Sequence, residues 1–300
     1  MPLAEIPLRA WRKRGQDFVF RGHTVRYWVA GQGEPLLLIH GFPTASWDWH
    51  YLWQPLAQRN LVIACDMLGF GDSAKPLDHD YCLLEQADLQ QALLEHLRVE
   101  QPVHVLAHDY GDSVAQELLA RHYEGRFQMA SCVFLNGGLF PETHRPALVQ
   151  KLLLSPLGWM IGRAFGRNAL ASSFNQIFGP QTRPSESVLD DFWSLISCND
   201  GPRILHKLIA YIPQRRRLRE RWLTAMQRGE VPLRVIDGEV DPISGAHMVE
   251  RYRQLVPQPD TIRLANIGHY PQIEAPVQVL KHYQAFRERI SQPSPRAAYS

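Results

Sequence analysis

The stretch VLAHDYGDSVAQEL at residues 105–118 decides the fold of this chain. Its apolar first half predicts a buried strand that ends at His108, and its second half predicts a helix that begins near Gly111. Asp109 lies between them, with the small residues Ala107 and Gly111 two positions before and after it. So sharp a turn places its apex side chain above the sheet edge, which is the geometry of a nucleophile elbow. The alternative is that Asp109 only caps the helix, because Asp is favoured at N-caps.

The remainder of the chain alternates between strand and helix patterns. Period-two burial predicts a strand over 23–30, and compact apolar runs predict buried strands at 35–40, 61–66, 103–108, 130–136, 233–237 and 261–265. Helical spacing separates these runs, for example at Leu89, Leu93 and Leu97. This alternation predicts an α/β fold with a mostly parallel, doubly wound sheet.

One interval, 139–230, breaks the alternation. It shows no strand pattern but holds three tryptophans, Trp159, Trp193 and Trp222. We expect a helical lid over the carboxyl ends of the strands, where open α/β sheets bind ligands. The predicted organisation is a core in two parts, 1–138 and 231–292, the lid at 139–230, and a flexible tail at 293–300.

Three further residues follow predicted strands. The loop HGFP at 40–43 offers the amide of Phe42, which can pair with the amide of Tyr110 as an oxyanion hole. The alternative is that HGFP is an ordinary turn between a strand and a helix, in which Gly and Pro only end the strand. Asp241 follows the strand at 233–237, and His269 follows the strand at 261–265. Asp109, Asp241 and His269 therefore stand in the order nucleophile, acid, base.

With these motifs in place, the chain resembles the α/β-hydrolase superfamily over nearly its whole length. The stretches that carry the resemblance are HGFP (40–43), DMLGFGDSAKP (66–76), HDYGD (108–112), DGEVD (237–241) and GHYPQIEAP (268–276). An aspartate nucleophile is typical of its epoxide hydrolase and haloalkane dehalogenase branch. Within that branch, NGGLFPETHRP (136–146), TRPSES (182–187) and YIPQRRRLRERW (211–222) resemble the mesoderm-specific transcript proteins. The resemblance implies an α/β-hydrolase fold with its lid inserted after the sixth strand.

The same resemblance implies a two-step hydrolysis. Asp109 would form an alkyl ester with the substrate, and His269, oriented by Asp241, would activate the water that cleaves it. Asn136 ends the preceding strand, where some dehalogenases place the acid, but an amide cannot carry the charge. Asp241 is therefore the predicted acid.

The leaving group separates the candidate activities. Phe42 and Tyr110 stand where related haloalkane dehalogenases place Asn and Trp halide donors, and fluoroacetate dehalogenases place Arg at the second position. An epoxide instead needs a lid tyrosine as proton donor, and Tyr211 is the single tyrosine of 139–230. An epoxide hydrolase is therefore favoured over a haloalkane dehalogenase, an ester or lactone hydrolase, and a non-catalytic binding protein. Substrate contacts are expected from His40, Trp159 and Trp222.

Asp112 and the arginine run from 215 to 221 each allow two interpretations. Asp112 lies three residues after Asp109, so we expect it to have a hydrogen-bond partner, with the lid as a candidate source. The alternative is an ordinary acidic residue in a first helical turn. The arginine run from 215 to 221 is interpreted as a solvated helix face, with docking of an anion as the minority interpretation.

Composition limits the remaining classes. The 32 basic and 30 acidic residues leave a net charge of +2, which does not favour a nucleic-acid binder. No apolar run is long enough to span a membrane, and the N-terminal residues lack a secretory pattern. Four widely spaced cysteines suit a reducing compartment. We therefore expect a cytoplasmic enzyme that acts on a small molecule, uses no cofactor and binds no metal; the sequence is silent on its oligomeric state.

Overall fold

The structure, a computed structural model, describes residues 3–292 of the chain. An eight-stranded sheet forms its centre, in the spatial order β1-β2-β4-β3-β5-β6-β7-β8. Its strands are β1 (Gln16–Phe20), β2 (His23–Ala30), β3 (Glu34–Ile39), β4 (Asn60–Cys65), β5 (Val103–His108), β6 (Met129–Leu135), β7 (Leu233–Gly238) and β8 (Thr261–Leu264). Strand β2 runs antiparallel to β1 and β4, and every other neighbouring pair is parallel. The α/β class and mostly parallel sheet predicted from sequence are confirmed.

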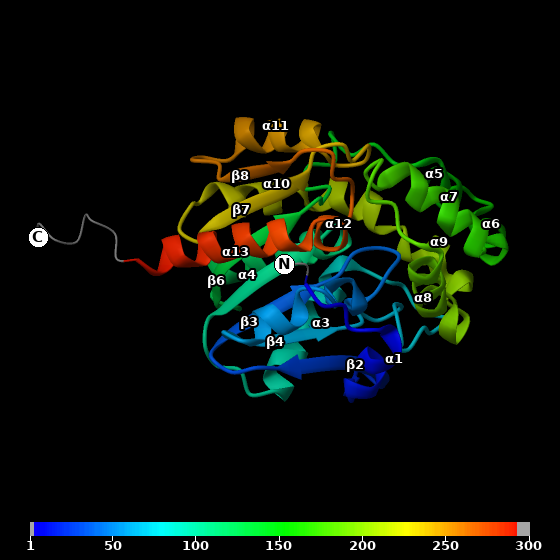
Figure 1. The fold of residues 1–300 in the computed structure, drawn as a ribbon, viewed down its shortest axis with the longest axis horizontal. Coiled ribbons are helices and arrows are strands. Elements are labelled where there is room, and N and C mark those ends of the chain that lie inside the picture. Colours follow the sequence, from blue (N-terminus) through cyan, green and yellow to red (C-terminus); the bar gives the residue numbers. More distant parts are fainter. Residues whose placement is uncertain (1–2, 293–300) are drawn as a thin grey trace, which may run out of the picture.

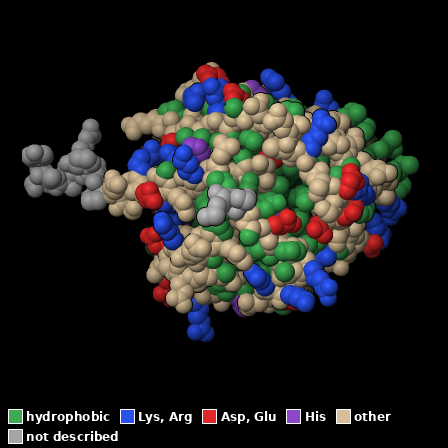
Figure 2. Space-filling view, viewed as in Figure 1, with side chains coloured by type: hydrophobic (Ala, Val, Ile, Leu, Met, Phe, Trp, Pro, Cys, Tyr) green, Lys and Arg blue, Asp and Glu red, His purple; other side chains and the backbone are tan. Residues whose placement is uncertain are grey.

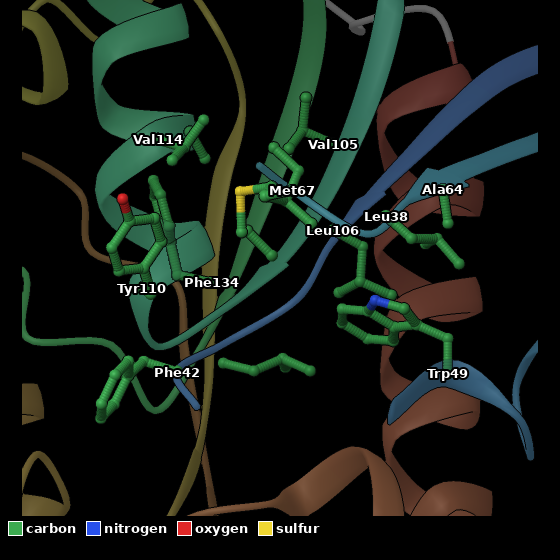
Figure 3. Close-up of a cluster of buried hydrophobic side chains, with 14 of the residues drawn as sticks. Leu38, Phe42, Trp49, Ala64, Met67, Val105, Leu106, Tyr110, Val114 and Phe134 are labelled. Carbon is green, nitrogen blue, oxygen red and sulfur yellow. The ribbon is translucent and has the colours of Figure 1, made fainter. Parts of the chain in front are cut away.

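Helices cover both faces of the sheet. In Figures 1 and 3, α4 (Tyr110–Tyr123) lies on one side of the strands and α13 (Pro276–Ser291) on the other. The remaining helices outside the segment between β6 and β7 are α1 (Leu8–Arg14), η1 (Ser46–Trp49), α2 (Trp53–Ala57), α3 (Leu83–His96), α11 (Ala246–Leu255) and α12 (Pro271–Glu274). Because both faces of the sheet are covered, the central strands are continuous apolar runs and do not alternate between apolar and polar residues.

Figure 3 shows how the buried strands and helices meet. Leu38, Val105 and Phe134 come from three neighbouring strands, and Val114 of α4 packs near them. All are fully buried. Truncating such a side chain to Ala costs about 2–5 kcal/mol, so this core fixes the strand ends that carry the site.

Helices are the only regular secondary structure in the segment between β6 and β7, where all residues are described. It contains α5 (Leu148–Leu153), α6 (Gly158–Ala164), α7 (Arg167–Ile177), α8 (Glu186–Ser197), η2 (Cys198–Ile204), α9 (Leu205–Leu208) and α10 (Tyr211–Gln227). Figure 1 shows α5 to α9 gathered at one end of the molecule. Helix α10 instead packs against α4. The interval 139–230 therefore contains both helices beyond the sheet and one helix that returns to cover it.

The structure also bears on the sheet edge, on the aromatic stretch after the HGFP loop and on membrane spans. Strand β1 was not predicted, because only Phe18 and Phe20 of its five residues are buried. The aromatic stretch after the HGFP loop forms the 3-10 turn η1 before the short helix α2. None of the helices in residues 3–292 is long and apolar enough to cross a bilayer. The predicted flexible tail at 293–300 lies outside the described residues.

Candidate active site

Asp109 stands at the apex of the turn between β5 and α4. Its backbone adopts φ +46° and ψ −102°, a strained conformation for a residue with a side chain. Gly111 makes the turn feasible, because a Cβ at this position would lie 2.3 Å from the carbonyl oxygen of Ile39. The first turn of α4 thus packs directly on the end of β3. The local geometry is that of the predicted elbow.

The Asp109 carboxylate is buried and held by two groups from distant segments. The amide of Phe42 donates to Oδ2 at 3.1 Å, and Nη2 of Arg215 lies 3.5 Å from Oδ1. Burial alone would raise the pKa of Asp109, but the charges of His269 and Arg215 and the Phe42 amide lower it below its ordinary value. The Asp109 carboxylate is therefore ionised near neutral pH.

The predicted oxyanion hole has one donor already in place, since Phe42 N binds Oδ2. Tyr110 is the first residue of α4, and the first amides of a helix have no partner within it. The Tyr110 side chain is buried and lies beside Val114 and Phe134 in Figure 3. Its backbone amide, rather than its phenol, is therefore the part that matches the predicted oxyanion hole.

His269 and Asp241 form a close pair at the ends of β8 and β7. Their Nδ1 and Oδ2 atoms are 2.8 Å apart. Burial alone would lower the pKa of His269, but the carboxylates of Asp241 and Asp109 raise it to about 9. Nδ1 is engaged by Asp241, so Nε2 is the ring nitrogen available to a water molecule.

Three neighbours hold the Asp241 carboxylate. The amide of Ile243 donates to Oδ1 at 2.8 Å, while the hydroxyl of Ser244 and Nδ2 of Asn136 donate to Oδ2, each at 3.0 Å. Asn136 also accepts a hydrogen bond from the amide of Gly238 at 2.7 Å. Asn136, which directly follows β6, is thus a hydrogen-bond partner of Asp241, the predicted acid.

Glu274 ties the His269 loop to the helical segment. Its Oε2 accepts from the amides of Gly268 and Gly179, and its Oε1 accepts from Tyr270 N. The amide of His269 itself donates to the carbonyl of Ile177 in α7 at 2.8 Å. The position of His269 therefore depends on the helices above the sheet as well as on the sheet.

Tyr211, the predicted proton donor, lies in the site. Its ring centroid is 5.8 Å from that of Phe42 and 5.1 Å from that of Tyr110. Nε2 of Gln150 donates to its hydroxyl oxygen at 3.2 Å, so the hydroxyl proton is free to be donated elsewhere. Burial and the nearby Asp109 charge raise the pKa of Tyr211, which keeps the phenol neutral.

Arg215 corrects the interpretation of the arginine run. Its side chain is only 1% exposed, its Nε donates to Ser113 Oγ at 2.6 Å, and its Nη2 donates to the Asp109 carbonyl at 2.9 Å. Arg219 and Arg221 do lie toward the surface, where they pair with carboxylates. The run is therefore not one solvated face. Its spacing of four from Tyr211 on α10 is the signal that could have placed Arg215 in the site.

Buried polar atoms without partners surround Arg215. Neither oxygen of Asp112, neither ring nitrogen of His144 nor Nη1 of Arg215 has a hydrogen-bond partner within residues 3–292. The partner expected for Asp112 is thus not found. Burial and the charge of Asp109 raise the pKa of Asp112 well above its usual range, and burial lowers the pKa of His144 to about 3. Both side chains are held in their neutral forms.

A cavity of about 50 Å³ opens beside His269. Its lining is mostly apolar: Phe42, Pro43, Ala147, Val149, Gln150, Leu153, Phe165, Leu170, Ser173, Phe174, Ile177, Leu205, Ile243 and His269. Most of these residues come from the helical segment, as expected for a lid. The cavity places apolar side chains next to the base and the oxyanion loop.

The three expected substrate contacts are not part of this lining. Both ring nitrogens of His40 are engaged by backbone, Nδ1 with Gly41 O and Nε2 with Met67 N. Trp159 is 47% exposed on the outer surface of α6. Trp222 is buried, but its Nε1 donates to Glu117 on α4 at 3.0 Å. Their sequence contexts were aromatic or loop-like, and only packing shows where each side chain points.

No group of three or more His, Cys, Asp or Glu side chains in residues 3–292 is arranged to hold a metal ion. The polar groups of the site are instead the two carboxylates, the imidazole, the phenol and the guanidinium described above.

Comparison with known proteins places this geometry in a family. A family model described as alpha/beta hydrolase fold matches residues 34–276. The chain belongs to the α/β-hydrolase-fold family. It is 41% identical over 302 residues to the human mesoderm-specific transcript homolog protein, a match that spans 95% of this chain and 89% of that protein.

One further relative of this α/β-hydrolase-fold protein and one solved structure are similar to it. LipZ of Mycobacterium tuberculosis is 39% identical over 248 residues, covering 82% of this chain and 85% of LipZ. The haloalkane dehalogenase DatA of Agrobacterium tumefaciens superimposes with a TM-score of 0.78 at 18% identity, covering 92% of this chain and 97% of DatA. The last match shows a shared fold.

Proposed function

We propose that this chain is an epoxide hydrolase that acts through an ester on Asp109. The observation that supports it most directly is the arrangement around the Asp109 carboxylate. One oxygen accepts from the Phe42 amide, and a buried phenol, a guanidinium and a histidine–aspartate pair surround the other side. The mostly apolar lining of the cavity beside His269 favours an apolar epoxide, and its volume of about 50 Å³ favours a small epoxide over a medium-sized one.

In the first step, Oδ1 of Asp109 attacks an epoxide carbon and the carbon–oxygen bond of the ring breaks. The alkoxide that forms takes the hydroxyl proton of Tyr211, which Gln150 leaves free. The attack requires the substrate to lie in line with a carboxylate oxygen, and such positioning accounts for much of the rate in a displacement of this kind.

In the second step, water hydrolyses the ester. Esterification removes the negative charge of Asp109, one of the two carboxylates that raise the pKa of His269. His269 then becomes a more effective base at neutral pH, takes a proton from water through Nε2, and the hydroxide attacks the Asp109 carbonyl. The amides of Phe42 and Tyr110 stabilise the oxyanion, and its collapse breaks the ester bond. The leaving alkoxide takes the proton of the Asp109 carboxyl group, and the proton held by His269 restores the Tyr211 hydroxyl as the diol leaves.

A dehalogenase is the second candidate, and Arg215 favours it specifically. A departing halide needs N–H donors, and neither the Phe42 nor the Tyr110 side chain supplies one. Nη1 of Arg215 is buried beside Asp109 and has no partner in the described part of the chain. A guanidinium there could bind the halide that Asp109 displaces.

Single-turnover hydrolysis in ¹⁸O-labelled water tests the proposed chemistry. With enzyme in excess over an apolar epoxide, the label should enter the Asp109 carboxylate, and the diol of the first turnover should carry no label. Label in the first diol would mean direct attack by water and would overturn the ester mechanism. Absence of turnover on every epoxide, together with halide release from haloalkanes, would move the assignment to the second candidate.

We extend the proposal to a cytoplasmic location. All four cysteines are free, and Cys65 and Cys132 are buried in the core, which fits a reducing compartment. Fractionation of cells that express the full chain tests this, with recovery from an oxidising compartment as the contrary result.

A further inference from the structure

The outer surface of α5 and α6 is unusually apolar. Eleven large hydrophobic side chains are exposed in the described residues, and six of them fall within 148–160: Leu148, Leu152, Leu154, Leu157, Trp159 and Met160. We call these six residues the outer face. Figure 2 shows hydrophobic side chains gathered at the edge of the molecule where Figure 1 places α5, α6 and α7. Contiguous apolar surface of this kind marks an interaction site.

Helix α5 carries apolar residues on two sides for two different reasons. Val149 and Leu153 face inward and line the cavity beside His269. Leu148 and Leu152, on the other side of the helix, are 71% and 41% exposed. The cavity explains the inward side, whereas nothing in the described part of the chain covers the outward one.

The sequence around the outer face carries basic residues but no acidic ones. Residues 143–185 contain no Asp or Glu, although the whole chain has nearly equal numbers of acidic and basic residues. The same stretch has five basic residues: Arg145, Lys151, Arg163, Arg167 and Arg183. Lys151 and Arg163 are exposed within the outer face, and the Arg163 guanidinium lies 5.4 Å from the centre of the Trp159 ring. An apolar surface that carries the cations Lys151 and Arg163 matches an anionic and apolar partner.

We propose that the outer face docks on the surface of an anionic lipid bilayer. The leucines and Trp159 would enter the boundary between headgroups and acyl chains, and Lys151 and Arg163 would pair with lipid phosphates. A second copy of this chain fits the surface less well. A two-fold contact would place the same cationic surface against itself, and like charges repel across such an interface.

Docking of this kind also defines a source of substrate, a step that rests on the proposed function. One side of α5 would contact the bilayer while its other side lines the cavity. An apolar epoxide dissolved in the membrane would then have the shortest route into the site past α5. The substrate class inferred is a membrane-partitioned, apolar epoxide.

Vesicle co-sedimentation tests the docking with the full chain. Vesicles of phosphatidylcholine with phosphatidylglycerol should bind the protein, and vesicles of phosphatidylcholine alone should bind it more weakly. The triple variant Leu148→Ser, Leu152→Ser, Leu157→Ser should lower binding by more than about tenfold, as should Lys151→Glu with Arg163→Glu. The matched control is Val19→Ser with Val277→Ser, exposed apolar residues elsewhere, which should bind as the parent does.

Trp159 provides an independent readout of insertion. Six of the other seven tryptophans, Trp11, Trp28, Trp47, Trp49, Trp53 and Trp222, are buried, and Trp193 is partly buried. Brominated lipids should therefore quench part of the tryptophan fluorescence of the parent protein. The variant Trp159→Phe should lose this quenchable part of the fluorescence. Equal binding by parent and outer-face variants, absence of quenching, or a dimer closed by this face that does not bind vesicles would overturn the proposal. Hydrolysis of a water-soluble epoxide without vesicles tests the catalytic proposal separately, since no outer-face residue lines the cavity.

Discussion

The strand ends and the outer face of α5 and α6 are built in opposite ways. At the strand ends, each charged group of the triad has a defined partner: Phe42 for Asp109, Asn136 for Asp241, and Asp241 for His269. On the outer face, large apolar side chains meet solvent without a partner in the described residues. The difference indicates that hydrogen bonds from the sheet and from the helical segment together fix the proposed reacting groups, whereas the outer face is left for a partner outside the described residues.

Removal of the proposed nucleophile, Asp109, should have the largest effect of any change at the strand ends. Asp109→Ala should lower epoxide turnover by about 10⁴-fold or more, because no other carboxylate is placed to form the ester. Steady-state assays measure the loss, and a thermal melt checks that the variant folds. The exposed Asp78→Asn is the matched control and should keep full activity. Residual turnover of Asp109→Ala close to the parent would refute a role as nucleophile.

Tyr211 tests whether the helical segment contributes chemistry as well as shape. Tyr211→Phe removes the hydroxyl but keeps the ring between Phe42 and Tyr110, so epoxide turnover should fall by about 10²–10³-fold. Ester formation from a haloalkane needs no proton donor and should change little. The comparison of the two substrates is the measurement. An equal loss on both would assign Tyr211 a packing role only.

Arg215 reaches Asp109 from helix α10, and its loss should have an intermediate effect. Arg215→Gln should lower kcat/KM by about 10²-fold, because it removes the bonds to Ser113 and to the Asp109 carbonyl. The Arg215 charge lowers the pKa of Asp109, so its removal should raise that pKa. The acidic limb of the pH–rate profile should therefore move to higher pH.

The neighbouring Arg216→Gln is the control for Arg215, because its side chain is exposed. It should leave both kcat/KM and the pH profile as in the parent. Loss of activity in Arg215→Gln with an unmoved acidic limb would mean that Arg215 only supports the fold of the elbow.

Asp112 should give the smallest effect, on stability rather than turnover. The pKa of Asp112 is raised in the folded state, so the folded chain binds more protons than the unfolded one above about pH 4. This carboxyl therefore contributes stability at low pH that is lost as the pH rises toward its folded pKa. Asp112→Asn cannot titrate, and its free energy of unfolding relative to the parent should increase from pH 5 to pH 8. Urea unfolding at both pH values measures this, and a constant difference would show that Asp112 is paired.

Sequence patterns were sufficient for the parts of the molecule that depend on local order. Seven strands and the elbow around Asp109 were predicted, because buried strands and a sharp turn each leave a contiguous signature. Strand β1 was not predicted, because it lies at the edge of the sheet and few of its residues are buried. The position of Arg215 and the outward orientation of Trp159 depend on how helices pack on one another. Neighbouring residues of one helix can face a carboxylate or solvent, and composition alone does not separate them.

The central claim is a covalent ester on Asp109, and the intact mass of His269→Ala tests it most directly. Without its base, this variant should stall at the ester after incubation with pooled epoxides and haloalkanes. We expect a mass gain equal to a whole epoxide, localised to Asp109. A gain equal to an alkyl group without its halogen would place the ester on the dehalogenase pathway. A folded variant that forms neither adduct would contradict the claim.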